Sequence, residues 1–590
     1  MSTTSTALVE IEGSPLPPEV VPLLTSAYVD DSQRLPDMFS LRFRDPGRIV
    51  LAKTNAKVGA KVKVSVMTAT ASAPEPLIEG EITALEAEFD AGGTFTVIRG
   101  YDQAHRLFRG RRTASYLQMT ASDIASKVAQ RAGLKVGTVT ATRTVFPHLS
   151  QAGQTDWDLL ELLARDSGFE VAVRDGSFSF TPPAPATKAP AASNGAGPNP
   201  LVLELGKDLL RFRSVLTSAQ QVGKVEVRGW DVATKQALTA TAPAKTTSAE
   251  LPTVKPEDLA KIFGDPVYVS TDVPYRTQAE VDEAANSLAE EIAGTFAEFE
   301  GVARGNPQVR AGAPISVSGL GEPFDGKYTV TSSRHRFEPT TGYTTSFSVT
   351  GRQNRTPLGL PSGGSLTRSA PAGVVVGVVD DVADPDKAGR VRLQFPWLAE
   401  DYVSDWARTL QPGAGNDRGW AVLPEVGDEV LVSFEQGDFS RPVVLGGLYN
   451  GVDTIPSGPA DLVDPGSGAV NRRSLVSRLG HRLDLLDQGG QKEGVRIATT
   501  GDKLLLNLDH TKTTITVHAD GKVLIEGSQG ITIDAASSAM ELKGGQISLK
   551  ATSGLTVDGG GGPVSVKSGS QLTLDGGAMC TMSAAMVKIN

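Results

Sequence analysis

Six histidines and one cysteine are the side chains best suited to bind metal or act as nucleophiles. No H-x-x-E-H or paired-cysteine pattern connects them, and a single cysteine removes the common structural zinc sites. If three copies of the chain packed around one axis, their His518 side chains could form a three-histidine ion site. The preceding residue, Val517, is expected to face that axis, so His518 should point away from it. We therefore predict no metal site, and we interpret the cysteine as a small core residue. The residues are His105, His148, His335, His481, His510, His518 and Cys580.

Paired carboxylates and glycine-rich loops give no stronger sign of catalysis. Asp484 and Asp487 are close in sequence, but nothing there sets their pKa values apart, and turn positions would explain both. Neither a G-x-S-x-G motif nor a phosphate-binding loop is present in its required context. Gly559–Gly562 is followed by neither a lysine nor a helix. We predict that the chain is not an enzyme and uses no cofactor.

Basic residues gather in two places where an acidic ligand could bind. Asp102–Arg112 holds five arginine or histidine residues, which could grip an acidic partner or phosphate, or form a solvated loop. Arg390, Arg392, Phe395 and Trp397 mix cations with aromatics as a nucleic-acid stacking groove does. Their alternation with apolar residues also fits a strand with one buried face. The formal charge of −10 argues against a general nucleic-acid or membrane binder. We predict no nucleic-acid partner.

The remaining question is which elements these residues belong to. Residues 1–354 predict an α+β region: strands, amphipathic helices at Thr120–Gly133, Asp156–Gly168 and Thr277–Phe299, and a hairpin at Phe169–Phe180. A Pro/Ala/Gly/Asn-rich linker lies near 181–200, and a second linker spans 355–371.

Residues 372–450 contain five short apolar segments, including Gly419–Pro424, which suit an OB-type barrel. Residues 451–512 read as a connector of strands with glycine turns. The first ten residues lack the pattern of a signal peptide, and no apolar run is long enough to span a membrane. We expect a chain made in the cytoplasm.

A short repeat fills residues 513–590. Apolar pairs separated by one residue recur from 515 to 587, so nine steps cover 72 residues. Alternation places both members of a pair on one face of a short strand. Two inward residues are too few for one turn of a single-chain β-helix, whereas three chains would supply one face each. At roughly 1.5 kcal/mol per side chain, burying these pairs would yield tens of kcal/mol.

We therefore predict an intertwined trimeric β-helix, and a single-chain β-solenoid remains the alternative. The predicted trimer core consists of Ile515, Val517, Val523, Ile525, Ile531, Ile533, Met540, Leu542, Ile547, Leu549, Leu555, Val557, Val564, Val566, Leu572 and Leu574.

Several segments resemble the VgrG family, the spike proteins of contractile injection systems. In the N-terminal half these are residues 156–168, 224–231 and 326–331, and the OB region adds 384–397, 424–432 and 442–450. The resemblance implies a mainly β protein: tail-hub barrels with helical inserts, an OB-fold barrel and the intertwined β-helix as a needle. It also implies a homotrimer that caps the inner tube, contacts baseplate proteins and punctures a target membrane when a sheath contracts.

The methionine-rich end predicts a further partner. An exposed apolar end calls for a cap, and the resemblance implies a PAAR-repeat tip protein, docked through Met582, Met586, Val587 and Ile589. The particle would be cytoplasmic or released from the cell, and a phage-tail-like extracellular particle is favoured. The alternative function is an adhesin or carbohydrate-active protein, built on a single-chain β-solenoid with an OB-type binding module.

Overall fold

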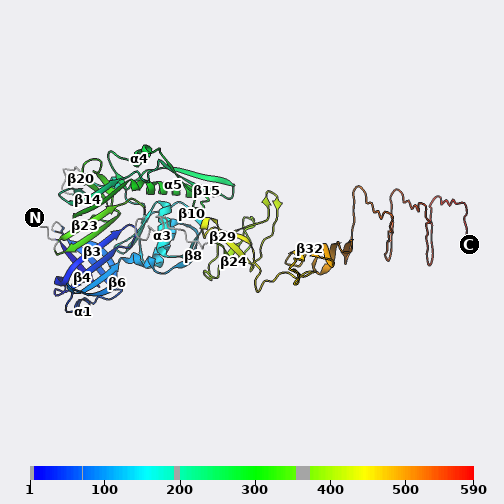
Figure 1. Cartoon of the computed structure of the whole chain (residues 1–590), viewed down its shortest axis with the longest axis horizontal. Coiled ribbons are helices and arrows are strands. Elements are labelled where there is room, and N and C mark those ends of the chain that lie inside the picture. The colour runs from blue at the N-terminus through cyan, green and yellow to red at the C-terminus, as the bar shows by residue number, and fades with distance from the viewer. Residues whose placement is uncertain (1–4, 69–70, 192–198, 340, 354–372, 590) are drawn as a thin grey trace. The chain divides into compact units, whose positions relative to one another are not determined.

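The computed structural model describes residues 5–68, 71–191, 199–339, 341–353 and 373–589. They divide into two compact units, Met1–Ile455 and Pro456–Asn590, which are described separately (Figure 1). The fold is mainly β, as the sequence predicted. The predicted linker at 355–371 lies outside the described residues, as does part of the tract near 181–200. A described part of that tract packs into the protein, because Ala186 is fully buried.

The largest sheet of the first unit has eleven strands (blue and green in Figure 1). Antiparallel pairing of β3 with β22 joins strands from the start of the chain to strands some 300 residues later. The spatial order is β14 (Leu209–Leu216), β19 (Ala297–Arg304), β23 (Gly342–Val349), β22 (Ser332–Glu338), β3 (Leu24–Ser32), β4 (Met38–Arg44), β7 (Gly93–Tyr101), β6 (Glu75–Asp90), β5 (Lys61–Met67), β1 (Thr6–Ile11) and β2 (Ser14–Pro15).

Helical inserts interrupt these strands where the sequence predicted helices. Both α2 (Ala121–Arg131) and α3 (Asp156–Ser167) begin with a capping box, Thr120 with Asp123 and Thr155 with Asp158. Gly168 ends α3 in the left-handed conformation, at φ 71°. The flanking strands are β8 (Arg112–Thr120), β9 (Lys135–Val139), β10 (Val145–Gln154), β11 (Glu170–Arg174) and β12 (Ser177–Thr181). The last two form the predicted hairpin.

The third predicted helix is shorter than expected. Helix α5 (Gln278–Ala293) ends before Gly294, and β19 follows at Ala297. Phe296 and Phe299 are buried in the sheet core, which favours a strand over more helix. The other elements are α1 (Val50–Thr54), α4 (Pro256–Ile262), β13 (Val202–Glu204), β15 (Lys224–Asp231), β16 (Gln236–Pro243), β17 (Ala249–Glu250), β18 (Val267–Ser270), β20 (Pro314–Ser318) and β21 (Gly326–Thr329).

The OB region forms a five-stranded sheet around an aromatic core. Its spatial order is β25 (Arg392–Gln394), β24 (Val375–Asp381), β29 (Glu429–Phe434), β30 (Pro442–Gly447) and β26 (Arg408–Thr409). The predicted strand at Gly419–Pro424 was wrong: β26 takes its place in the sheet. Most of the predicted segment lies on an exposed hairpin whose strands are β27 (Ala414–Gly415) and β28 (Arg418–Gly419).

In the second unit, five consecutive strands pair antiparallel. They are β31 (Arg472–Val476), β32 (Arg482–Gln488), β33 (Lys492–Ala498), β34 (Leu504–Asp509) and β35 (Thr514–Ala519). The first apolar pair of the repeat, Ile515 and Val517, lies in β35. Residues 520–589 contain no strand, so the predicted strands of the later pairs do not form in the single chain. A strand forms where its backbone can pair with a neighbouring strand, and these residues do not pair with one another in this way.

Candidate functional site

The five strands β31–β35, here called the connector sheet, have one polar and one apolar face. Asp484, at the centre of the polar face, is 0% exposed. It accepts hydrogen bonds from Ser474 Oγ at 2.5 Å and Arg482 Nε at 2.7 Å, and Arg496 lies 3.7 Å away. Burial acts to raise the pKa of Asp484, but these hydrogen bonds and charges outweigh it and lower the pKa. Asp484 is thus a structural ion-pair partner.

The expectation that turn positions explain both carboxylates was wrong. Asp484 and Asp487 lie within β32, where successive residues face opposite sides of the sheet. Asp487 is exposed and pairs with Arg473 Nη1 at 2.6 Å. The two groups therefore do not form a catalytic pair.

Chain residues 456–462 cover the polar face. Arg472 Nη2 donates to Pro456 O at 2.7 Å, and Arg482 Nη1 donates to Ser457 O at 2.9 Å. The face that the chain itself covers is therefore the polar one, the reverse of an ordinary single-chain sheet.

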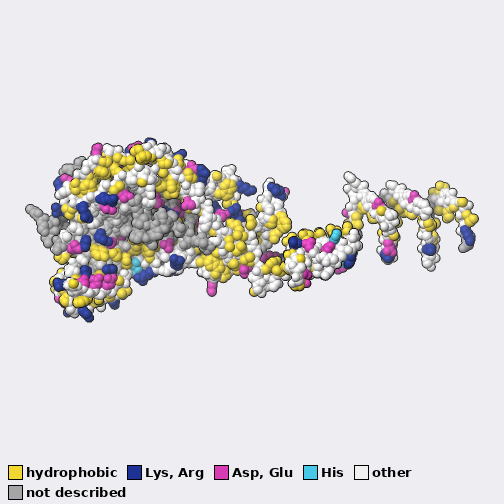
Figure 2. Space-filling view, in the orientation of Figure 1, with side chains coloured by type: hydrophobic (Ala, Val, Ile, Leu, Met, Phe, Trp, Pro, Cys, Tyr) yellow, Lys and Arg dark blue, Asp and Glu magenta, His cyan; other side chains and the backbone are white. Residues whose placement is uncertain are grey.

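The apolar face of the connector sheet is open to solvent. Strand register places Leu483 opposite Ile497, Ile497 opposite Leu506, and Leu506 opposite Val517. Hydrophobic side chains reach the surface of this region (Figure 2). The face consists of Leu475, Leu483, Leu485, Ile497, Leu504, Leu506, Leu508, Ile515 and Val517, each 38–73% exposed. An apolar face of this extent indicates an interaction surface.

The repeat continues this exposure to the end of the described chain. All sixteen predicted core residues, Ile515 to Leu574, are 49–73% exposed in the single chain. The predicted docking residues Met582, Met586, Val587 and Ile589 are also exposed. The single chain thus presents these residues without burying them, and their roles in a trimer core and in tip docking stay predictions.

Within the first unit, polar contacts connect the helical inserts to the OB barrel. Ser150 and Tyr402 share a hydrogen bond of 2.6 Å between their hydroxyls, and Ser150 N donates to Ser440 Oγ at 3.0 Å. Arg276 and Glu435 form an ion pair at 2.7 Å. These contacts indicate that the barrel is docked on the inserts.

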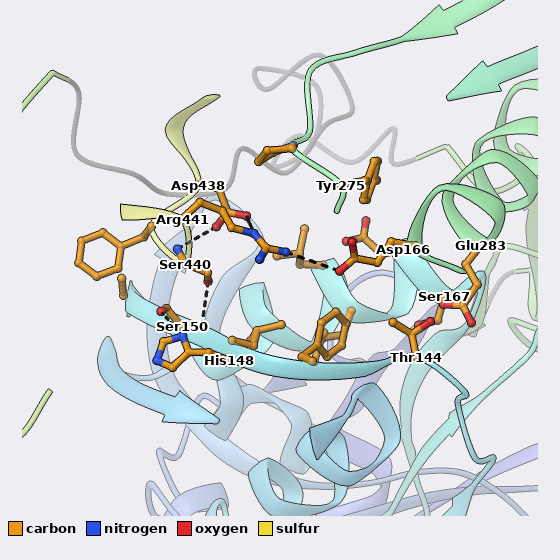
Figure 3. A pocket seen from close by; sticks show the side chains of 18 of the residues that line it. Thr144, His148, Ser150, Asp166, Ser167, Tyr275, Glu283, Asp438, Ser440 and Arg441 are labelled. Carbon is orange, nitrogen blue, oxygen red and sulfur yellow. Dashed lines mark hydrogen bonds and ion pairs between the residues drawn. The ribbon is translucent and has the colours of Figure 1, made fainter. Parts of the chain in front are cut away.

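A cavity of about 70 Å³ lies at this junction (Figure 3). His148 lines it, and burial lowers the pKa of this imidazole. Arg441, another lining residue, lies 3.6 Å from Glu280. The groups around the cavity hold the barrel in place, and we assign them a structural role.

Two other histidines and the first basic cluster are used inside the protein. His335 Nδ1 lies 2.9 Å from Tyr343 Oη, and burial lowers the pKa of His335 to about 4. His105 and Arg106 both contact Glu81, whereas Arg109, Arg111 and Arg112 are exposed. Two of the five residues of the predicted basic cluster are therefore paired with an internal glutamate. The described residues contain no cluster of three or more His, Cys, Asp or Glu that could hold a metal ion.

Two of the residues considered for a stacking groove, Phe395 and Arg390, are engaged within the OB barrel. Phe395 is fully buried, together with Val391 and Leu393, as the alternation predicted. Arg390 is bound to Asp384 at 2.6 Å, and Trp397 donates to Val376 O at 2.8 Å. Only Trp397 of the two aromatics is exposed.

No described helix is long and apolar enough to cross a membrane.

One buried polar cluster escaped sequence reasoning. Arg310 Nε lies 3.0 Å from Asp31 and its Nη2 3.9 Å from Asp37. Asp102 N donates to Asp37 O at 2.9 Å. Burial raises the pKa of Asp102 from 3.8 to about 7. Because Arg310 is 279 residues from Asp31, no local pattern could have revealed this contact.

Family models and curated relatives match parts of the chain. Residues 59–338 match a family described as the Alg8 N-terminal domain, and residues 375–449 match the type VI secretion system/phage-baseplate injector OB domain. Spike protein VgrG1c of Pseudomonas aeruginosa is 29% identical over 133 residues, which cover 22% of this chain and 18% of the relative. Spike protein VgrG3 of Vibrio cholerae is 32% identical over 143 residues, covering 23% and 14%.

The overall fold also has a counterpart among solved structures. A chain of the half-lidded PdpA–VgrG complex of Francisella aligns with a TM-score of 0.51 at 10% identity, covering 88% of each chain. This likeness concerns the fold. The matched segments span less than a fifth of the length of the two curated relatives. The chain is therefore VgrG-like, with a β-rich hub-and-spike fold and a baseplate-type OB domain.

Proposed function

We propose that this VgrG-like chain is the structural hub and spike of a contractile injection machine, and that it works as a homotrimer without catalytic activity. One observation carries the proposal: the apolar face of the connector sheet is open, and the apolar pairs after it are exposed as well. A single chain would leave this whole surface in water, whereas three chains around one axis would bury it.

The parts of the trimer would have separate tasks. The N-terminal half would bind the inner tube and baseplate, and the barrels would form a collar. The β-helix would be the needle that breaches a target membrane when the sheath contracts. A PAAR-type protein would cap Met582, Met586, Val587 and Ile589. Similarity to type VI spike proteins supports this role. The particle would assemble in the cytoplasm and stay there or be released.

A pair of substitutions in β35 tests the trimer directly. Val517 lies on the apolar face, and Thr516, which points the other way, is also exposed in the single chain. In a trimer, Val517→Asp would place three carboxylates in a dry core, at a cost of several kcal/mol. We expect Val517→Asp to reduce the trimer fraction in light scattering at least tenfold (about 1.4 kcal/mol per tenfold change), whereas Thr516→Asp leaves it unchanged.

The comparison also separates the alternatives. If the chain worked as a monomer, both residues would remain in water, and neither substitution would change the measured mass. Equal effects of the two substitutions would contradict the proposed inward face. The single-chain adhesin draws no support from residues 520–589, which form no strand of their own.

A further inference from the structure

A hairpin arm, residues 410–426, projects from the OB barrel beside β29 (Figure 1). The side chain of Gln411 clamps its base: Nε2 donates to Val422 O at 2.9 Å, and Oε1 accepts from Val422 N at 3.2 Å. Trp420 N donates to Gly413 O at 3.0 Å. Gly419, at φ 134°, permits this approach, because a Cβ there would lie 2.2 Å from Gly413 O. The arm is therefore held as an ordered hairpin.

The arm carries several large apolar side chains that do not belong to the barrel core. Its large apolar side chains are 43–62% exposed, and the core cluster of the described barrel includes none of them. They are Leu410, Trp420, Val422, Leu423 and Val426. An ordered, exposed tryptophan flanked by aliphatic residues is typical of an interface anchor.

A second apolar surface, here called the barrel strip, lies on the outside of β24 and β30. Its residues are 36–53% exposed: Val374, Val376, Trp397 and Leu445. Trp397 is fixed there by its hydrogen bond to Val376 O. Leu431, paired with Val376 across the strands, adds to the strip.

We propose that the arm of one copy lies across the barrel strip of the next copy, so that three arms close a ring at the level of the OB barrels. This rests on the proposed trimer. Each chain carries one arm and one strip, so pairing arm with strip forms a head-to-tail contact that closes when the rotation fits.

A second copy is the occupant that the chemistry favours. The connector sheet follows the barrel directly in the chain, and its apolar face also needs other copies for burial. Glu425, Asp428 and Glu429 lie at the foot of the arm and would repel phosphate or an anionic membrane surface. The apolar barrel strip of another copy would bury Trp420 without placing these carboxylates against phosphate or an anionic membrane surface.

Photo-crosslinking of the full-length chain tests this contact. A benzophenone analogue of phenylalanine replaces Trp420, and crosslinked peptides are identified by mass spectrometry. We expect two-chain products that join position 420 to residues 374–376 or 445–449 of another copy. Leu445→Asp, an exposed change that should not disturb folding, should lower their yield at least tenfold (about 1.4 kcal/mol). The same analogue at Arg418, on the hairpin tip, serves as the control and should give much less of these products.

Light scattering on the same samples keeps the two proposals distinguishable. A trimer whose position 420 crosslinks only within its own chain, to another surface, to a foreign protein or not at all would overturn the arm contact and leave the proposed spike intact. A monomer would overturn both.

Discussion

At the scale of single residues, the N-terminal half of the chain (residues 1–354, here called the hub) contains buried acidic groups whose charges are costly to fold. Arg310 contacts Asp31 and Asp37, and Asp102 is buried beside Asp37. Burial raises the pKa of both Asp37 and Asp102. Raised pKa values often mark active sites, but here the acids surround an internal ion pair between Arg310 and Asp31, so we interpret the cluster as a structural one that carries an electrostatic cost of folding.

This cost predicts a pH dependence of hub stability. Below pH 3.8, Asp102 is protonated in both native and unfolded states, and from there to about pH 7 only the native form keeps the proton. The free energy of unfolding therefore falls as pH rises through this window, and the full cost is present above pH 7. Asp102→Asn keeps the hydrogen bond to Ala104 N and removes the charge. We expect calorimetry to show a hub stabilised by on the order of 1–3 kcal/mol at pH 8 and unchanged near pH 4.

The control is Asp401→Asn, at an exposed position. It should leave the free energy of unfolding of the hub unchanged at both pH values. A hub that is equally stable at pH 5 and pH 8, with or without Asp102→Asn, would contradict this electrostatic cost.

At the scale of elements, the loop between β24 and β25 shows what the OB motif at 384–397 does. The Asp384 carboxylate accepts from the backbone N–H groups of Asp386 at 3.1 Å, Ala388 at 2.9 Å and Arg390 at 3.3 Å. It also accepts from the Arg390 guanidinium, which lowers the pKa of Asp384 well below its usual range. One side chain thus closes the loop that sets the path from β24 into β25.

Removing this carboxylate should destabilise the barrel. Asp384→Ala leaves three backbone donors and a guanidinium without their acceptor, at a cost of about 2–3 kcal/mol. Asp386→Ala is the control in the same loop, because the Asp386 side chain is 72% exposed and its ion pair is with Arg390 alone; it should cost less than about 1 kcal/mol. The unfolding midpoint of the barrel in urea measures both. Equal losses would show that Asp384 does not organise the loop.

Which elements could be predicted depended on how local their causes are. The capping boxes of α2 and α3 are formed by residues three positions apart, so the sequence contained the whole signal. Gly419–Pro424 looked like a strand because it is apolar, but apolarity marks burial in general. Here the segment lies mostly on the exposed arm, and two residues of β26 complete the sheet instead. The contact of Arg310 with Asp31 joins distant segments and left no trace in either neighbourhood.

The candidate assembly surface was partly predictable for the same reason. The repeat could be recognised from the regular spacing of its apolar pairs. The resemblance to VgrG proteins agrees with the matched OB domain and spike relatives. The inverted polarity of the connector sheet depends on the register of five strands, and on residues 456–462 crossing the polar face. Neither can be read from spacing.

At the scale of the whole molecule, the proposed spike requires three chains that meet along one axis. Cys580 provides a probe, since it is the chain's one cysteine and is exposed in the single chain. Three in-register copies would bring three Cys580 thiols together at the axis. Copper-phenanthroline with oxygen should then oxidise two thiols to one disulfide. Non-reducing gels should show two-chain and one-chain bands, and Cys580→Ser should abolish the former. A freely reactive thiol without two-chain bands would contradict the in-register needle.

The mass of the intact particle in solution decides between a trimeric spike and a single-chain protein. Light scattering or native mass spectrometry of the full-length chain should give three times 61.8 kDa, with no dissociation on dilution, because separating the chains would expose the connector face and the apolar pairs together. A mass of 61.8 kDa at all concentrations would contradict the trimeric spike and leave those surfaces to another partner.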